Sequence, residues 1–220
     1  MCDSVDVDLA HILERLFPAA CLACGAADAA LCAACLRDAS RPQRFVAGGV
    51  PGFALGAYAG TLRRAVLAVK RGRRDVADAL GAALCDRFGA ALPRDAVLVP
   101  VPTGARRRAA RGFDQSILLA RRAGEVAGLP VLCALREVAG GAQHGRSRAD
   151  RLAARERFVC SAALVAGVRA VLVDDVVTTG GTLRDCAAAL RGGGSRIEGA
   201  LVVARALAGA GRRSGERLDS

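Results

Sequence analysis

The stretch from Val171 to Leu183 constrains the fold more than any other part of the chain. It reads VLVDDVVTTGGTL: an apolar, β-branched run, two adjacent carboxylates, a loop of small hydroxyl and glycine residues, and then a helical pattern. The apolar run predicts a buried strand that ends at the acid pair. The spacing of Leu183, Ala187 and Leu190 predicts a helix after the loop. This order leaves free backbone N–H groups at the start of a helix, where the helix dipole favours an anion.

The loop from Thr178 to Thr182 has the composition of a phosphate site. Its glycines let the backbone come close to a ligand, and its threonines add hydroxyl donors. Asp174 and Asp175 do not suit phosphate, but they suit sugar hydroxyls or a hard cation such as Mg²⁺. The stretch therefore predicts a site for a phosphorylated sugar or a nucleotide.

This stretch resembles the phosphoribosyl-diphosphate (PRPP) signature of type I phosphoribosyltransferases. The family pattern is four apolar residues, two acids, two apolar residues and then Thr-Thr/Ser-Gly-x-Thr, and residues 170–182 match each class of position. The resemblance implies that Asp174 and Asp175 face the ribose hydroxyls. It also implies a 5′-phosphate cradle made by Thr178, Thr179, Gly180, Gly181 and Thr182.

Two other interpretations of the acid pair stay open at this point. One is an ordinary buried strand followed by a polar turn. The other is an aspartyl-phosphate enzyme or a receiver domain, but those proteins need acids at other strand ends and do not use a threonine-rich phosphate loop.

Alternating elements along the rest of the chain predict an α/β fold with a parallel sheet and helices on both faces. The expected strands are 53–58, 96–101, 131–135 and 196–203, and the expected helices are 61–69, 75–88 and 115–126. By resemblance, the sheet is of the type I phosphoribosyltransferase kind, with a small N-terminal zinc-binding region.

Changes in composition predict three segments. Arg41-Pro42 and the following Gly48-Gly49 mark a boundary between an N-terminal helix and zinc-ribbon-like region, residues 1–47, and a larger domain, residues 48–207. The N-terminal helix is indicated by helical spacing from Val5 to Leu16. Residues 208–220 are rich in Gly, Arg and Ser and are expected to form a disordered tail.

Four cysteines have the spacing of a structural zinc site. They form two CxxC pairs, Cys21 with Cys24 and Cys32 with Cys35, seven residues apart. Two such pairs offer four thiolates to a tetrahedral Zn²⁺. The alternative is four cysteines in a flexible leader. Nine cysteines, and an N-terminus unlike a signal peptide, indicate a reducing cytoplasm with metal-bound or free thiols rather than disulfides.

The charge of the chain points to anionic partners and excludes some others. The net charge of +11 is carried almost wholly by Arg, which suits phosphorylated small molecules or nucleic acid. Aromatic residues make up 3% and Trp is absent, so bases are not expected to stack on an aromatic platform. No apolar run approaches the roughly 20 residues needed to span a bilayer.

Several basic residues are candidates for holding a diphosphate. Lys70 is the only lysine and suits a site that needs a compact point charge, although it also fits a plain surface position. A basic cluster follows the expected strand at 96–101, and a Gly- and Arg-rich segment at 136–157 is typical of a functional loop. His144 in that segment is a weaker candidate for acid–base chemistry. The diphosphate candidates are Lys70, Arg106, Arg111 and Arg146, and Arg148 is a candidate catalytic residue.

From Leu16 to about Arg205 the chain resembles the competence protein F (ComF) family of phosphoribosyltransferase-like proteins. The matches are Phe17-Pro18 with the CxxC pairs, Tyr58 with Leu62 and residues 70–74, Val99 to Pro102 with residues 111–115, and Gln143 with Ser147-Arg148 and Arg151. The chain departs from the family at Asp114, where Asn is usual, and in the loop near Gln143. The extra charge of Asp114 is expected to weaken diphosphate binding.

The resemblance implies a phosphoribosyltransferase that binds PRPP with Mg²⁺, or a nucleoside 5′-phosphate, and transfers phosphoribose to an unidentified nitrogen acceptor with release of diphosphate. Asp174, Asp175 and Arg148 are the expected catalytic residues. The alternative is a non-enzymatic adaptor for competence or DNA uptake that uses the same fold to bind a ligand, DNA or a partner protein. The sequence identifies neither the acceptor nor the oligomeric state.

Overall fold

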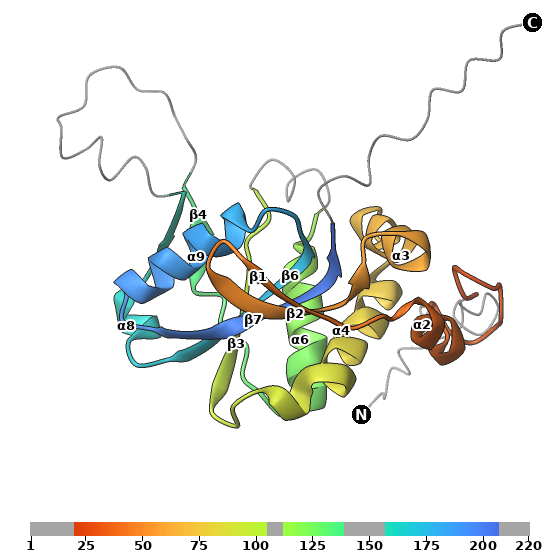
Figure 1. Cartoon of the computed structure of the whole chain (residues 1–220), viewed down its shortest axis with the longest axis horizontal. Coiled ribbons are helices and arrows are strands. Elements are labelled where there is room, and N and C mark those ends of the chain that lie inside the picture. The colour runs from red at the N-terminus through yellow and green to blue at the C-terminus, as the bar shows by residue number, and fades with distance from the viewer. Residues whose placement is uncertain (1–19, 105–111, 139–156, 207–220) are drawn as a thin grey trace, which may run out of the picture.

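The computed structural model describes residues 20–104, 112–138 and 157–206 (Figure 1). Its centre is a five-stranded sheet with the order β1-β2-β7-β6-β3, in which β1 is antiparallel and the other strands are parallel. The bounds are β1 Gln43–Ala47, β2 Val50–Ala57, β3 Ala96–Pro100, β6 Arg169–Val177 and β7 Arg196–Arg205. The α/β class and the mostly parallel sheet predicted from the sequence are confirmed.

Helices cover both faces of this sheet, as expected (Figure 1). The helices of one face are α3 Gly60–Lys70, α4 Arg74–Phe88 and α6 Gln115–Ala127; those of the other are α8 Ala162–Val165 and α9 Gly181–Gly192. A short 3₁₀ turn, η1 Gly89–Ala91, follows α4. In β6, Val171 and Val173 pack with the first group, and Ala170 and Leu172 pack with the second. The continuous apolar run arises because β6 is buried on both faces.

Gly48 and Gly49, interpreted from the sequence as a boundary, lie at the turn of a β-hairpin. Both have positive φ angles, 60° and 76°, as in the tight type I′ turns that join antiparallel strands. The turn joins β2 to β1, a strand that was not predicted because it is short, exposed on one side and at the edge of the sheet. The β1–β2 hairpin spans the domain boundary predicted after residue 47, and the division into domains stays a prediction.

Two strands differ from their expected bounds. β6 does not end at the acid pair but continues through Asp174 and Asp175 to Val177. The strand expected at 131–135 was wrong: only Val131 pairs with β3, and the chain then forms β4 Leu135–Glu137. β4 pairs with β5 Phe158–Cys160 in a separate antiparallel hairpin.

The N-terminal part packs on the same core as the larger sheet. Cys21, Ala30 and Leu31 are buried in the cluster that contains Leu55 and Leu62. The short helix α2 Ala33–Ala39 follows the second pair of cysteines. Among the described helices, none is both long and apolar enough to cross a membrane. The helix expected at 5–16 and the tail expected at 208–220 lie outside the described residues.

Candidate functional site

The acid pair and the threonine loop line two adjoining hollows at the carboxyl edge of the parallel sheet. The larger has a volume of about 300 Å³ and includes Lys70, both acids and residues that follow β3. The smaller has a volume of about 210 Å³ and lies over the loop from Thr178 to Thr182. Asp174, Thr178 and Thr182 line both hollows. Ligands of open α/β sheets bind at this edge.

Asp174 is half-buried and receives two hydrogen bonds. Its Oδ1 atom accepts from the hydroxyl of Ser116 at 3.3 Å and from the backbone N–H of Asp175 at 2.8 Å. Burial, and next the charge of the neighbouring Asp175, raise the pKa of Asp174 well above the usual range of a carboxyl group, against the effect of the two donors. A group in this state releases its proton more readily when a cation or a hydroxyl donor comes close.

Asp175 is buried and forms an ion pair with Lys70, whose Nζ atom lies 2.8 Å from Oδ2. No hydrogen bond from the described residues reaches this oxygen, so the ion pair is its one contact with a charged or donor group there. Lys70 was predicted as a diphosphate contact. The structure places it in the larger hollow, with its charge already directed at the acid pair.

The loop after β6 exposes backbone donors at the start of α9. Among the described residues, the N–H groups of Thr178, Thr179 and Gly180 donate to no acceptor. Gly180 is the N-cap residue of α9, with a φ angle of 81°, and no side chain caps this helix. These amides, the helix start and the threonine hydroxyls offer donors that suit an anion, and the phosphate site expected at this loop stays a prediction.

A contact distant in sequence fixes the shape of this loop. A Cβ atom at Gly180 would collide with the backbone of Ala47 and Gly48 in the β1–β2 turn, and one at Gly48 would collide with the carbonyl of Gly180. The two glycines therefore allow the hairpin turn to pack directly on the loop. The sequence predicted a ligand contact for Gly180, but not this contact with the hairpin turn.

Arg157 is a charged residue of the site that the sequence analysis missed. It lines both hollows, and its guanidinium donates to Oε1 of Glu137 at 3.0 Å and to Oγ1 of Thr182 at 3.3 Å. It directly precedes β5, whereas the loop block of the family resemblance ended at Arg151. Only the pairing of β4 with β5, which the sequence did not indicate, brings it to the loop.

Asp114 does not act as a free charge in the described site. Its carboxylate accepts from the backbone N–H of Thr103 at 2.8 Å, from the Thr103 hydroxyl at 3.1 Å and from the backbone N–H of Ser116 at 3.1 Å. It is 5% exposed and caps the start of α6. The four candidates Arg106, Arg111, Arg146 and Arg148, and also His144, lie outside the described residues.

The four cysteines of the two CxxC pairs form one cluster. The Sγ atoms of Cys21, Cys24, Cys32 and Cys35 lie within 4.8 Å of one another. Tetrahedral Zn²⁺ with Zn–S bonds of about 2.3 Å needs sulfurs about 3.8 Å apart, and Cys24 and Cys32 have this separation. Backbone N–H groups, that of Cys32 first, lower the pKa of the Cys21 thiol to about 6, whereas hydrogen bonds with the thiols of Cys24 and Cys32 raise the pKa of Cys35 to about 12. Cys21 is therefore the thiol that most readily supplies a thiolate. The cluster can bind a metal ion such as zinc.

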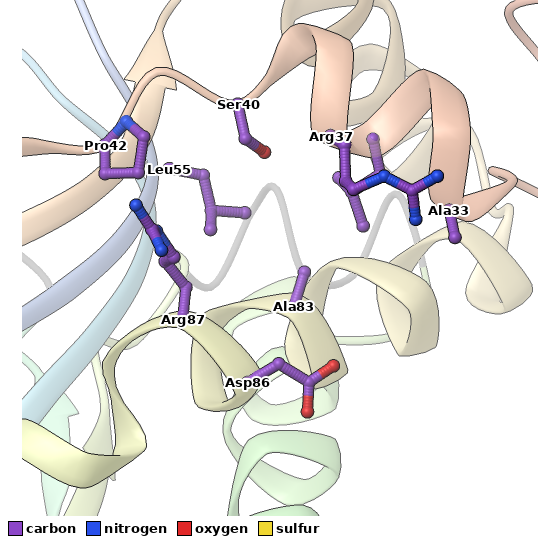
Figure 2. A pocket seen from close by; sticks show the side chains of 9 residues that line it. Ala33, Arg37, Ser40, Pro42, Leu55, Ala83, Asp86 and Arg87 are labelled. Atoms are coloured by element: carbon purple, nitrogen blue, oxygen red, sulfur yellow. The ribbon is translucent and has the colours of Figure 1, made fainter.

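A third cavity, of about 380 Å³, separates α2 from α4 (Figure 2). Figure 2 shows Arg87 rising from α4 toward Pro42 and Leu55, with Arg37 across the opening on α2. None of the acids or threonines of the two hollows lines this cavity. Its walls carry no constellation of groups for catalysis.

Comparisons with known proteins gave structural similarities alone. No family model matches the chain, and no curated protein matches it. Glutamine PRPP amidotransferase from B. subtilis, solved with ADP and GMP, is 26% identical over 58% of this chain, with a TM-score of 0.43. This chain spans about a quarter of the length of that protein, 26%.

Two smaller proteins are similar over more of their length. Orotate phosphoribosyltransferase from Aeropyrum pernix is 21% identical, over 78% of this chain and 89% of that chain, with a TM-score of 0.42. A phosphoribosyltransferase from Corynebacterium diphtheriae is 19% identical, over 67% and 83% of the two chains, with a TM-score of 0.36.

Proposed function

We propose that the chain binds PRPP, or a nucleoside 5′-phosphate, at the carboxyl edge of the sheet and transfers phosphoribose to a nitrogen acceptor, with release of diphosphate. One observation supports this above all others. A loop with unpaired amides and an acid pair lie on the same strand end and line adjoining hollows. A ligand with a phosphate at one end and vicinal hydroxyls a few ångströms away fits both.

In this proposal the two parts of the ligand meet different groups. The amides and hydroxyls from Thr178 to Thr182 hold the 5′-phosphate. Asp174 and Asp175 accept hydrogen bonds from the ribose hydroxyls, and Oδ2 of Asp175, whose one donor contact in the described part of the chain is Lys70, has room to accept a second. Lys70 then balances the charge of the acid pair.

The acid pair also fits Mg²⁺ brought by PRPP. This ion is commonly held by one or two carboxylates together with phosphate oxygens of the substrate and water. Asp174 and Asp175 supply the carboxylates, and no third acidic residue is needed. When bound, the ion would neutralise charge on the departing diphosphate.

The reaction breaks the bond from the anomeric carbon to the diphosphate oxygen and forms a bond from that carbon to nitrogen. The electron pair of the broken bond leaves with the diphosphate. The protein accelerates such a step by fixing the sugar phosphate and by placing positive charge where negative charge develops. Lys70 and the predicted residues Arg106, Arg111, Arg146 and Arg148 are proposed for the second task.

We also propose that the cysteine cluster holds a structural Zn²⁺, as the ComF resemblance implies, and that the protein works in the cytoplasm. The cluster lies in the small N-terminal part and packs through Cys21 on the main core. It is therefore assigned a role in stability or in partner binding rather than in transfer.

An adaptor for DNA uptake is the second candidate. The observation that favours it is positive charge away from the hollows: Arg37 and Arg87 have no acidic partner in the described part of the chain and face the cavity of Figure 2. DNA binding of this kind is independent of sequence and weakens steeply with salt, because each phosphate contact releases a counterion. A sequence-selective complex that salt does not weaken contradicts this candidate.

Diphosphate release from PRPP, measured with Mg²⁺ and a panel of bases and nucleotides, separates the two functions. A transferase releases diphosphate with at least one acceptor, and Arg148→Ala lowers turnover far more than PRPP affinity, because the arginine acts in the transition state. Binding of PRPP is followed separately by the rise in melting temperature. Binding without release by any acceptor excludes the transferase and favours the adaptor.

A further inference from the structure

The smaller hollow has an unusual balance of charge for a phosphate site. Of the described residues that line it, Asp174 and Asp185 are acidic and Arg157 is the only base. Asp185 is partly neutralised by Arg184, at 2.9 Å, whereas Lys70 lines only the larger hollow. The loop itself offers uncharged donors. Within the described part of the chain, a phosphate dianion in this hollow therefore depends on one side chain for a direct opposite charge.

The contacts of Arg157 with other described residues leave much of its donor capacity free. Its Nε donates to Oε1 of Glu137, its Nη1 donates to Oγ1 of Thr182, and its Cζ lies 5.0 Å from the ring centre of Phe158. A guanidinium has five N–H donors in a fixed plane. The contacts with Thr182 and Phe158 hold this plane at the rim of the loop, and Arg157 is itself exposed.

We propose that Arg157 binds the 5′-phosphate and makes the loop selective for phosphorylated ligands, and that Glu137 competes with the phosphate for this arginine. The proposal rests on the function proposed above, in which the loop holds a 5′-phosphate. Phosphate matches the guanidinium fork in two parallel hydrogen bonds and carries more charge than a carboxylate. Glu137 then keeps Arg157 at the rim of the empty loop, at the cost of some affinity.

If Glu137 competes with the phosphate, substitutions of Arg157 and Glu137 change the affinity for ribose 5-phosphate in opposite directions. If the ion pair has a purely structural role, both substitutions change it in the same direction. Ribose 5-phosphate and ribose are the probes, with binding measured by calorimetry at neutral pH. Arg157→Gln should weaken the binding of ribose 5-phosphate by about tenfold to a hundredfold, the usual value of a charged hydrogen bond. Glu137→Gln should strengthen it by up to about fivefold, because the exposed ion pair that it removes is weak.

Two further variants separate charge from shape. Arg157→Lys should recover part of the affinity, since it restores the charge without the planar fork. Arg136→Gln is the matched control: it removes one charge from the same hairpin, at an exposed position that lines neither hollow, and should change affinity less than twofold.

The dependence on pH adds a readout that a structural role leaves unchanged. A phosphate monoester takes up its second negative charge near pH 6. The affinity of the parent for ribose 5-phosphate should rise as the pH increases through this value, and the rise should be smaller in Arg157→Gln. Affinity for ribose should be equal in the parent and all four variants.

Several outcomes overturn the proposal. If Glu137→Gln weakens binding as Arg157→Gln does, the pair has a structural role and Glu137 is no competitor. If ribose 5-phosphate binds the parent and Arg157→Gln equally, the arginine is not a phosphate contact, while the loop remains a phosphate site. If the parent binds no 5-phosphate at all, the function proposed for the loop fails together with this inference.

Discussion

Two strand–loop–helix junctions lie at the same edge of the sheet, and they use the start of a helix in opposite ways. Where β3 leads to α6, Asp114 caps the helix and accepts three hydrogen bonds, from Thr103 and Ser116. Where β6 leads to α9, the N-cap is Gly180, no side chain caps the helix, and the loop amides are unpaired in the described part of the chain.

The difference shows how a fold can close one helix start with its own side chain and leave another open. A carboxylate from the chain meets the donors of α6 permanently, so this junction stabilises the protein without a ligand. The junction at α9 leaves its donors to water or to an anion and gains stability only when one binds. Among the described residues, the absence of a side-chain cap distinguishes the junction proposed to bind a ligand from the one closed by Asp114.

The largest effect is expected at the cysteine cluster. It is the counterpart of the open α9 junction, because it offers sulfur ligands to a cation where the junction offers N–H donors to an anion. Replacing two ligands in Cys21→Ser/Cys35→Ser should reduce the zinc content from about one ion per chain to none, because structural zinc supplies about 10–16 kcal/mol of binding free energy. Elemental analysis of the purified protein measures this content. Cys133→Ser, at an exposed cysteine outside the cluster, is the control and should retain the metal. Equal zinc content in both variants would exclude the cluster as the metal site.

Gly180→Ala tests whether the shape of the open junction depends on the glycine. The free energy of unfolding should fall by about 2–4 kcal/mol, because the new Cβ atom meets a positive φ angle and collides with the β1–β2 turn. Ribose 5-phosphate binding should be lost as well. Denaturant unfolding and calorimetry measure the two effects.

The neighbouring Gly181→Ala is the control, because its Cβ atom would lie 3.9 Å from Oγ1 of Thr179, an ordinary van der Waals distance. The stability of this variant should stay within about 0.5 kcal/mol of the parent. Equal losses in Gly180→Ala and Gly181→Ala would show that the contact with the hairpin turn has no special role.

Asp114→Ala opens the closed junction. Removal of the cap and of its bonds to Thr103 should lower the free energy of unfolding by about 1–2 kcal/mol, whereas Asp114→Asn, which retains a capping oxygen, should lose less. Binding of ribose 5-phosphate, measured by calorimetry, should survive in both variants. If Asp114→Ala abolishes binding as Gly180→Ala does, the contrast between the junctions is wrong.

Asp174→Asn has the smallest expected effect on the free energy of unfolding, and it should raise this free energy rather than lower it. The raised pKa means that the folded protein holds this proton more tightly than the unfolded chain, so its stabilising effect is present below the usual carboxyl range and is lost as the pH rises through the folded pKa. At neutral pH the variant should therefore be more stable than the parent, by on the order of 1 kcal/mol, while binding PRPP more weakly.

Unfolding curves recorded from pH 4 to pH 8 measure this difference. It should grow with pH for Asp174→Asn and stay near zero for Asp86→Asn, a change at an exposed aspartate of α4. A difference that shrinks with rising pH would contradict the burial of an unfavourable charge at Asp174.

The sequence predicted the parts of the site that are continuous along the chain. The apolar run, the acid pair and the small residues from Thr178 to Thr182 lie next to one another, so local pattern was sufficient for the strand, the loop and the helix. The prediction that the strand ends at the acids was wrong, because Val176 and Val177 still pair with β7.

Features that depend on pairing across the chain were not predicted. Arg157 reaches the loop only because β5 pairs with β4, both of which are three residues long and carry little periodic signal. The packing of Gly48 on Gly180 depends in the same way on the β1–β2 turn. The three hydrogen bonds of Asp114 were not predicted either, because they come from a loop eleven residues earlier and from the helix start.

The order of strands in the sheet has a consequence for biosynthesis. β7 lies between β2 and β6 and is the last strand of the sheet to leave the ribosome. Until it emerges, β2 and β6 have no common neighbour, and the turn at Gly48 cannot be brought against Gly180. Contacts between distant parts of a sequence form slowly, and unpaired strand edges expose backbone groups to other chains. The loop from Thr178 to Thr182 of a nascent chain therefore takes its final shape late, after most of the polypeptide has been synthesised.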